Sequence, residues 1–456
     1  MLLIPIIIVV VLLISGTVAI APSQILKPAF AITFGSTRNL SNNDEDSLNP
    51  QVQASSSNVY TAWEDKTKGD GDTFFRRSSD AGSSFHSIVD LSNNAAGEAT
   101  DQKVTKIGNN VYVVWSENGD VFFKRSTDNG AHFKSTINLS NDEDKSRTPQ
   151  IAAVGNNVYV AWFEFVSQQD GNQVFFKRST NEGASFGDVK NLSAPRSDET
   201  IFSIRIAATG NNVYVAWIGG AGDHGECPDD ADLEFARSTN SGSSFGGFNR
   251  INDNLLCDQR RAGLDLEATG SNVYLVWNDR PFETACDINL QCNDILFVKS
   301  TDNGAHFGSI SNLSNNDGDS FNPQMDLHGS NVYIVWQDRT PGNLDILFRV
   351  STNNGSTFAS AKNLSNNDGD SRNAQISSVS DAVRIVWQDN GELGNFDIFF
   401  RASGNEGDSF GSIKNLSNNS GESSVPQIIS SGGNIYVVWQ DKTPGNFDIF
   451  FKKGVD

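Results

Sequence analysis

The segment NVYIVW, residues 331–336, is one of eight copies of a single motif in this chain of 456 residues. Seven copies read N-[VI]-Y-x-x-W, and the other reads AVRIVW, residues 382–387. Each copy ends at one of the eight tryptophans of the protein, which lie 47 to 60 residues apart: Trp63, Trp115, Trp162, Trp217, Trp277, Trp336, Trp387 and Trp439. A period near fifty residues indicates a repeat architecture.

The sixth repeat shows what one unit contains. Short runs rich in apolar residues occupy 322–327, 331–337 and 345–350, and a weaker run occupies 361–364. Clusters of Gly, Asn, Asp and Ser separate them, as expected for turns between strands. The second and third runs are almost continuously apolar, which is typical of a sheet covered on both faces. The pattern predicts one four-stranded blade per repeat, and therefore an all-β, eight-bladed propeller of antiparallel blades.

The ends of the chain predict how the ring closes. The last repeat stops after its third strand, at Lys453, and residues 32–40 (ITFGSTRNL) match a fourth strand such as 410–416 (FGSIKNL). We expect the N-terminal strand to complete the C-terminal blade, which removes an open sheet edge. Residues 32–456 then form one propeller domain.

A second motif lies between the third and fourth strands. It reads SSDAGSSF from Ser78, STDNGAHF from Ser126 and STNNGSTF from Ser351, and it occurs seven times. It resembles the Asp-box, S-x-D-x-G-x-x-[W/F], of sialidase-like (BNR-repeat) propellers, over the chain from about residue 32 to the end. The resemblance implies a structural turn, whose third position is held by Asp80, Asp128, Asn181, Asn240, Asp302, Asn353 and Asn405.

The resemblance would also imply catalysis by an arginine triad, a Tyr nucleophile assisted by Glu, and an Asp acid/base. The chain departs from that pattern because it lacks the N-terminal R-I-P signature. All seven tyrosines occupy the same place in the strand-two motif, so none is left as a nucleophile. Arg205 stands where five other blades carry Gln, and Arg280 and Arg339 form no recognisable set with it.

Composition restricts the partners and the compartment. A net charge of −21 excludes a nucleic-acid binder. Residues 1–31 begin with an apolar, uncharged stretch, which predicts a signal peptide or an uncleaved N-terminal membrane anchor; we favour cleavage at Ala29-Phe30-Ala31. Either reading predicts a secreted or cell-surface protein, which we expect to be monomeric. N-x-S sequons recur, chiefly as the NLS of the fourth strand, so glycosylation is an open alternative to a packing role.

The four cysteines all lie in the fourth and fifth repeats: Cys227, Cys257, Cys286 and Cys292. Outside the cytoplasm they predict two disulfides. Of the three connectivities we favour Cys227–Cys257 with Cys286–Cys292. The spacing of a zinc ribbon is absent.

Acidic loops gather on the face opposite the Asp-boxes. Carboxylates, amide oxygens and a Gly within six residues suit Ca²⁺, although the same residues are ordinary turn formers. The calcium candidates are Asp44, Asp46, Asp317, Asp319, Asp368 and Asp370.

A specific site should break the repeat, and the fourth and fifth repeats depart from it most. The candidate residues there are Arg205, Glu226, Asp230, Arg260 and Arg261. A carboxylate beside an arginine in these loops fits either glycoside chemistry or a recognition surface. We expect a non-catalytic propeller that binds a glycan or an extracellular protein. The alternatives are a sialidase-like exo-glycoside hydrolase and a structural cell-envelope protein.

Overall fold

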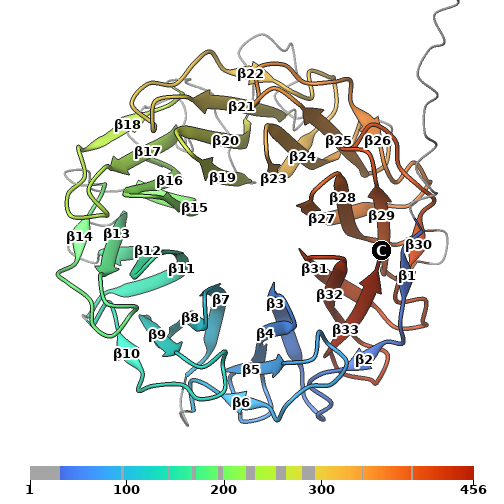
Figure 1. Ribbon diagram of the computed structural model, residues 1–456, viewed down its shortest axis with the longest axis horizontal. Coiled ribbons are helices and arrows are strands. Elements are labelled where there is room, and N and C mark those ends of the chain that lie inside the picture. Colours follow the sequence, from blue (N-terminus) through green and yellow to red (C-terminus); the bar gives the residue numbers. More distant parts are fainter. Residues whose placement is uncertain are drawn as a thin grey trace, which may run out of the picture.

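A computed structural model describes residues 31–93, 97–141, 143–166, 171–193, 199–221, 232–252, 263–279, 293–340, 342–391 and 394–456. The described residues form eight antiparallel sheets arranged as blades around a central axis (Figure 1). They contain strands and no helix, and so no helix that would cross a membrane. The predicted eight-bladed all-β propeller is confirmed.

Each blade runs outward from an inner strand to an outer one, in sequence order. The inner strands are β3 (Ser47–Ser55), β7 (Ala99–Ile107), β11 (Lys145–Val154), β15 (Glu199–Thr209), β19 (Leu264–Thr269), β23 (Ser320–His328), β27 (Ser371–Val379) and β31 (Ser423–Ser431). The second strands, which carry the tryptophan motif, are β4 (Asn58–Asp65), β8 (Asn110–Glu117), β12 (Asn157–Val166), β16 (Asn212–Ala221), β20 (Asn272–Asp279), β24 (Asn331–Asp338), β28 (Ala382–Asp389) and β32 (Asn434–Asp441).

The third strands lie next to these, and short fourth strands form the rim. The third strands are β5 (Asp72–Ser78), β9 (Asp120–Ser126), β13 (Gly171–Ser179), β17 (Asp232–Ser238), β21 (Asp294–Ser300), β25 (Asp345–Ser351), β29 (Asp397–Ser403) and β33 (Asp448–Val455). The fourth strands are β6 (Val89–Asp90), β10 (Ile137–Asn138), β14 (Lys190–Asn191), β18 (Phe248–Arg250), β22 (Ser311–Asn312), β26 (Lys362–Asn363) and β30 (Lys414–Asn415).

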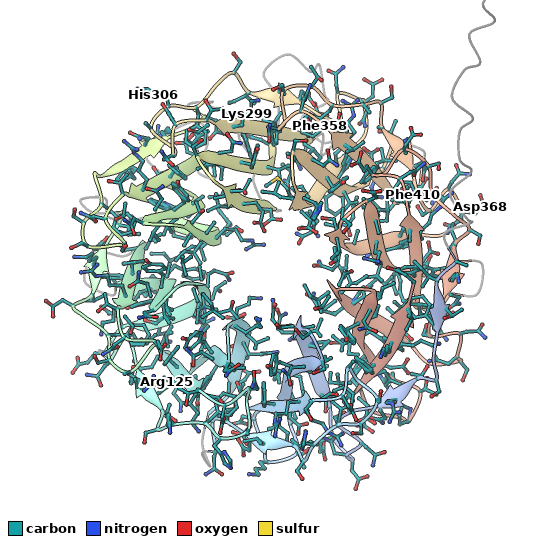
Figure 2. All side chains as sticks on the ribbon, viewed as in Figure 1. Arg125, Lys299, His306, Phe358, Asp368 and Phe410 are labelled. Carbon is teal, nitrogen blue, oxygen red and sulfur yellow. The ribbon has the colours of Figure 1, made fainter. Side chains whose placement is uncertain are left out.

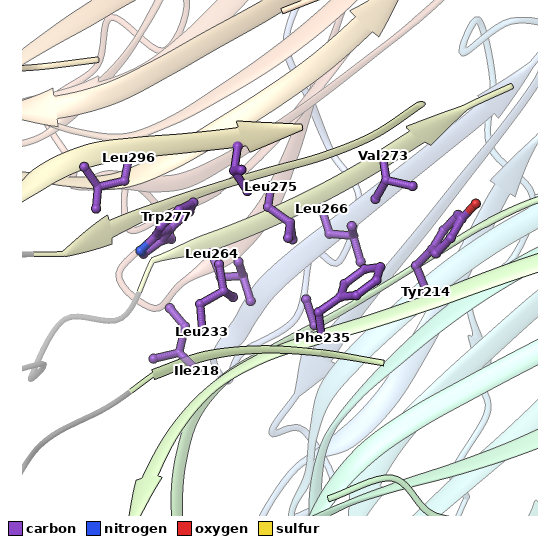
Figure 3. Close-up of a cluster of buried hydrophobic side chains, with 12 residues drawn as sticks. Tyr214, Ile218, Leu233, Phe235, Leu264, Leu266, Val273, Leu275, Trp277 and Leu296 are labelled. Atoms are coloured by element: carbon purple, nitrogen blue, oxygen red, sulfur yellow. The ribbon is translucent and has the colours of Figure 1, made fainter. Parts of the chain in front are cut away.

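The continuous apolar motif is explained by two-sided burial. In β24, Val332, Ile334 and Trp336 pack in one cluster with the preceding blade. The alternating residues Tyr333 and Val335 pack in another cluster, with the following blade. Side chains alternate across a strand, so a blade between two blades needs apolar residues at every position. Figure 3 shows the equivalent cluster between the fourth and fifth blades.

The N-terminal strands close the ring as predicted. β1 (Thr33–Phe34) and β2 (Arg38–Asn39) both pair with β33, the third strand of the eighth blade. Phe34 meets Phe400 of the seventh blade edge to face, with ring centroids 4.9 Å apart and an interplanar angle of 78°. The Asp-box phenylalanines make the same contact around the ring, for example Phe410 on Phe348 at 5.0 Å and 78°. Phe34 therefore takes the place of an eighth Asp-box phenylalanine.

Candidate functional site

The Asp-box residues are used within their own turns. In the sixth box the Ser351 hydroxyl donates to Asn353 Oδ1 (2.9 Å) and accepts from the Gly355 amide (2.9 Å). Asn353 Oδ1 also accepts from the Thr357 amide at 2.9 Å. Gly355 has φ +69°, and a Cβ there would lie 2.7 Å from Phe297 of the preceding blade. The box is thus a closed turn that presses on its neighbour, and its polar groups are not directed at a ligand.

In seven of the eight blades an acid stands two residues after the tryptophan, and in the sixth blade it shows how such an acid holds a blade together. Asp338 Oδ2 accepts from Trp336 Nε1 (3.0 Å) and from the Ser320 hydroxyl (2.8 Å). It also accepts from Asn316 Nδ2 of the acidic loop, at 2.8 Å. Its Oδ1 accepts from the Thr340 amide at 2.8 Å, which fixes the hairpin to β25 by an Asx turn. Asp338 therefore bonds the acidic loop between β22 and β23 to the sixth blade, which follows that loop.

The calcium candidates divide into two kinds. Asp46, Asp319 and Asp370 accept hydrogen bonds from residues that lead into the third strands. Asp44, Asp317 and Asp368 are exposed, and Asp368 lies at the periphery in Figure 2. Over the described part of the chain, no group of three or more His, Cys, Asp or Glu side chains is placed to hold a metal ion. Calcium binding stays a prediction, which melting temperatures in Ca²⁺ and in EDTA would check.

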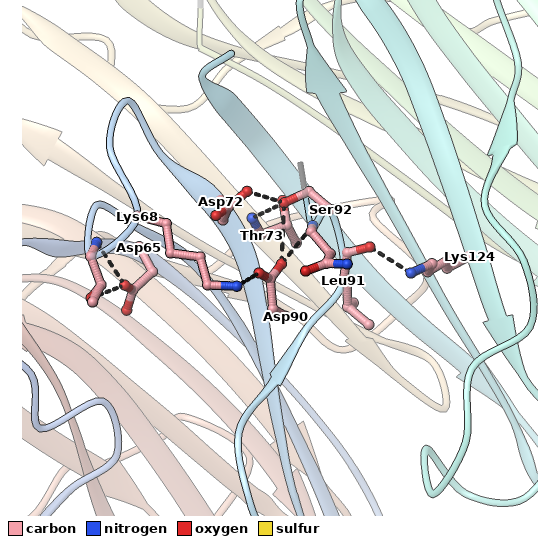
Figure 4. Close-up of polar contacts among 10 residues, drawn as sticks. Asp65, Lys68, Asp72, Thr73, Asp90, Leu91, Ser92 and Lys124 are labelled. Carbon is pink, nitrogen blue, oxygen red and sulfur yellow. Dashed lines mark hydrogen bonds and ion pairs between the residues drawn. The ribbon is translucent and has the colours of Figure 1, made fainter. Parts of the chain in front are cut away.

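The sequon asparagines have a role in the fold. Asn363 Nδ2 donates to Asp345 Oδ2 (2.6 Å), and the Ser365 hydroxyl of the same NLS donates to Asp345 Oδ1 (2.7 Å). In the first blade the motif reads Asp90-Leu91-Ser92, and Ser92 Oγ donates to Asp72 at 2.7 Å (Figure 4). The recurrence of N-L-S thus has a structural cause independent of glycosylation.

Part of the predicted site lies outside the described residues. This holds for Glu226, Asp230, Arg260 and Arg261, and for Arg280. It also holds for Cys227, Cys257, Cys286 and Cys292, and for the N-terminal export segment. Arg205 is among the described residues and lies on the inner strand β15.

Eight half-buried side chains of the inner strands form what we call the axial ring. Each pairs in register with the residue before a tryptophan, and each stands twelve residues before that tryptophan in the sequence. The members are Gln51, Lys103, Gln150, Arg205, Asp265, Gln324, Gln375 and Gln427. Five are glutamines, so the repeat is broken at Lys103, Arg205 and Asp265. Two residues further along the same strands, Glu267 and Asp326 add two more charges.

The charged members interact across neighbouring blades. Arg205 Nε lies 3.8 Å from Asp265 Oδ1, and Arg205 also donates to the Ile204 carbonyl oxygen at 2.9 Å. Asp265 Oδ2 accepts from the Met325 amide of the next blade at 2.9 Å. Burial raises the pKa of Asp265, against the opposing charge of Arg205. Burial likewise raises the pKa of Asp326 to about 6.

Arg339 lies elsewhere, in a pocket of about 410 Å³ at the face of the acidic loops. The pocket spans the junction of the sixth and seventh blades. It is lined by Phe321, Asn322, Gln337, Arg339, Leu344, Arg372, Asn373 and Gln388. The structure therefore does not unite Arg205 and Arg339, but it gives Arg339 a second arginine and four amides as neighbours.

Internal hydrogen bonds hold the pocket amides in place and leave donors for a ligand. Gln337 Oε1 accepts from the Asn373 amide (2.6 Å), and Gln388 Oε1 accepts from Asn373 Nδ2 (2.9 Å). Neither Gln337 Nε2 nor Gln388 Nε2 donates to another described residue. Arg372 is partly neutralised, because its Nη2 lies 2.7 Å from Asp370 Oδ2.

Sequence reasoning missed most of these residues. Counting back twelve positions from each tryptophan would have found Lys103. Counting back ten would have found Glu267 and Asp326. The sequence indicates the pocket residues less clearly than the axial ring, because Arg339 and Arg372 are 33 residues apart and line one pocket only when two blades pack together.

Comparisons with known proteins identify no family for this chain. No family model matches the chain, and no curated protein matches it in sequence. Among solved structures, a protein of unknown function from Dyadobacter fermentans is 12% identical, covers 93% of this chain and 99% of its own, and has a TM-score of 0.45. An α-L-arabinofuranosidase from Fusarium graminearum is 10% identical, over 67% and 92% of the two chains, with a TM-score of 0.43.

The NanB sialidase from Streptococcus pneumoniae is 9% identical, over 92% of this chain and 94% of its own, with a TM-score of 0.39. Likeness at this level carries no argument about activity or ligand.

Proposed function

We propose that this protein is an exported, non-catalytic propeller that binds a glycan in the pocket between the sixth and seventh blades. The observation that carries the proposal is the lining of that pocket: amides and two arginines beside Phe321 and Leu344. Sugar hydroxyls are recognised by convergent polar groups, and the apolar face of a sugar ring packs on apolar side chains. A volume of about 410 Å³ has room for one or two sugar residues.

The pocket is prepared for a polar ligand before the ligand arrives. Gln337 and Gln388 are almost fully buried and are fixed by the neighbouring bulged strand, so little side-chain freedom remains to be lost on binding. Arg339 is exposed on the hairpin that leads from β24. Its charge adds a preference for glycans with an acidic group over neutral ones.

The test is a glycan array followed by calorimetry on the full chain. Arg339→Ala and Asn322→Ala should each weaken the best glycan about tenfold, since each removes hydrogen bonds worth about 1.5 kcal/mol. The chain offers a matched control in Lys442→Ala, because Lys442 has the same position after its tryptophan in the eighth blade and does not line the pocket. Equal losses in Arg339→Ala and Lys442→Ala, or no glycan bound, would contradict the proposal and favour a protein partner.

A glycoside hydrolase is the second candidate, and one observation favours it. Burial, together with the charges of Asp265 and Asp326, raises the pKa of Glu267 well above its ordinary value. A protonated carboxyl beside a second carboxyl is the arrangement that glycosidases use for acid catalysis. Mass spectrometry of glycans incubated with the protein separates the candidates, since only a hydrolase releases free sugar.

A further inference from the structure

Two ionisable side chains of opposite charge type lie on inner strands, next to the ring axis, and have no hydrogen-bonding partner among the described residues. One is the ammonium of Lys103 on β7, in the second blade. The other is the carboxyl of Glu267 on β19, in the fifth blade. Two blades separate them on one side of the ring and four on the other, so they approach the axis from different sides (Figure 1).

On the cationic side, Lys103 has a cation for a neighbour. Burial and the charge of Arg205 lower the pKa of Lys103 to about 8, and only Asp101 acts in the opposite sense. Asp101 is itself engaged, because its Oδ2 accepts from the Thr148 amide at 3.2 Å. Arg205 has Asp265 as its counter-charge at 3.8 Å. Lys103 is therefore the cation of this sector whose charge is least compensated, and an anion beside it would be stabilised.

On the acidic side lie the carboxyl groups of Asp265, Glu267 and Asp326, and two of the three accept hydrogen bonds that stabilise the fold. Asp265 Oδ2 accepts from the Met325 amide and Asp326 Oδ2 accepts from the Ser378 amide, so each fastens its inner strand to the next blade. Glu267 makes no such bond. It stands at the same strand level as Asp326 and two residues from Asp265, which makes its surroundings unfavourable for a third negative charge.

We propose that the axial ring, together with Glu267 beside it, binds a zwitterionic ligand, with the ligand's carboxylate at Lys103 and its ammonium group at Glu267. Such a ligand supplies the missing counter-charge at both ends at once. The glutamines between them, Gln150 on one side and Gln324, Gln375, Gln427 and Gln51 on the other, offer neutral amides to the connecting part of the ligand. This site is separate from the glycan pocket, whose lining shares no residue with it.

The site is tested with ω-amino acids of increasing length, from glycine to 8-aminooctanoate, titrated calorimetrically into the full chain at pH 7. Diamines and dicarboxylates of the same lengths are the charge controls. The variants are Lys103→Gln, which introduces the residue that the axial ring carries in five blades, and Glu267→Gln, which removes the ionisable group and keeps the size of the side chain. Lys106→Gln is the matched control, because Lys106 lies on the same strand and its side chain points to the opposite face of the sheet.

We expect one chain length to bind best, more tightly than its diamine and dicarboxylate counterparts, and more weakly as salt is raised. Lys103→Gln and Glu267→Gln should each weaken it about tenfold, as expected for loss of one charged hydrogen bond, and Lys106→Gln should not. The proposal is overturned if no ω-amino acid binds, if a dicarboxylate or diamine binds equally well, or if both variants retain the wild-type affinity. The preference of the unmodified protein among the three probe classes decides the question even if a variant fails to fold.

Discussion

Replacing Asp338 by Ala should cost about 3 to 5 kcal/mol of unfolding free energy. The change leaves the Trp336 indole N–H and the Ser320 hydroxyl without an acceptor, and both residues are fully buried. A buried donor left unpaired costs about 1 to 3 kcal/mol. The lost bonds to Asn316 and Thr340, nearer the surface, add about 1 kcal/mol together.

Urea unfolding followed by tryptophan fluorescence measures this cost, because Trp336 is one of the groups released. Asp317→Ala is the control: Asp317 lies in the same acidic loop and is exposed, so its loss should change stability by less than about 0.5 kcal/mol. If both variants unfold at the same urea concentration, the carboxylate after the tryptophan does not hold the blade. The fourth blade shows that one such gap is tolerated, since Gly219 stands at that position and Trp217 Nε1 has no acceptor among the described residues.

The same carboxylate gives a pH dependence. Burial raises the pKa of Asp338, but the hydrogen bonds from Thr340, Trp336 and Asn316 outweigh it and leave the pKa below its ordinary value. A carboxyl whose pKa is lower in the folded state stabilises the fold above the unfolded pKa, and that contribution is lost as the pH falls through the folded value. Wild type should therefore lose stability below about pH 4, and Asp338→Ala should lose less of it there.

Three further predictions concern the ring and its centre. Phe34→Ala should cost about 2 kcal/mol in urea unfolding, because it removes the contact with Phe400 that closes the ring, and the exposed Val455→Ala should be neutral. Gly355→Ala should cost about 3 kcal/mol, whereas Gly329→Ala, with φ +60° and open space around it, should cost about 1 kcal/mol; equal costs would exclude the clash with the neighbouring blade. Glu267→Gln should raise the melting temperature at pH 7 and should give no such gain below about pH 4. The reason is that a carboxyl whose pKa is raised by folding destabilises the fold as the pH rises. A lower melting temperature of the variant at pH 7 would contradict this prediction.

The repeat made the fold predictable. Eight tryptophan motifs defined eight second strands, and the likeness of residues 32–40 to a fourth strand located the closure. These features are carried by short, local segments, so the sequence displays them directly. The Asp-box turns are local in the same sense, since Ser351, Asn353 and Gly355 bond within five residues.

The candidate sites were less visible because they combine residues from different blades. Lys103 and Glu267 are 164 positions apart, and nothing in either local segment marks the two residues as parts of one site. The sequence marked the acidic loops as candidate sites, but several of these carboxylates are hydrogen-bonded within a blade, as at Asp338, or between two blades, as at Asp370. Packing of one inner strand beside the next supplies the information that a single repeat lacks.

The closure of the ring has a consequence for how the protein reaches its native state. Asn39 of β2 pairs with Phe450 of β33, so β2 can pair only after the other blades have been synthesised. Contacts of such long sequence separation form late and slowly. The first seven blades are complete without that contact and can form in order, each on its predecessor. Until the last segment has been synthesised, the partly formed ring is open, and the blade at each end has one face that no neighbouring blade covers. The chain is most prone to aggregation during that interval. A circular permutant that joins residue 456 to residue 31 and opens the chain between two blades would turn this last step into a local one, and should refold faster to the same ring.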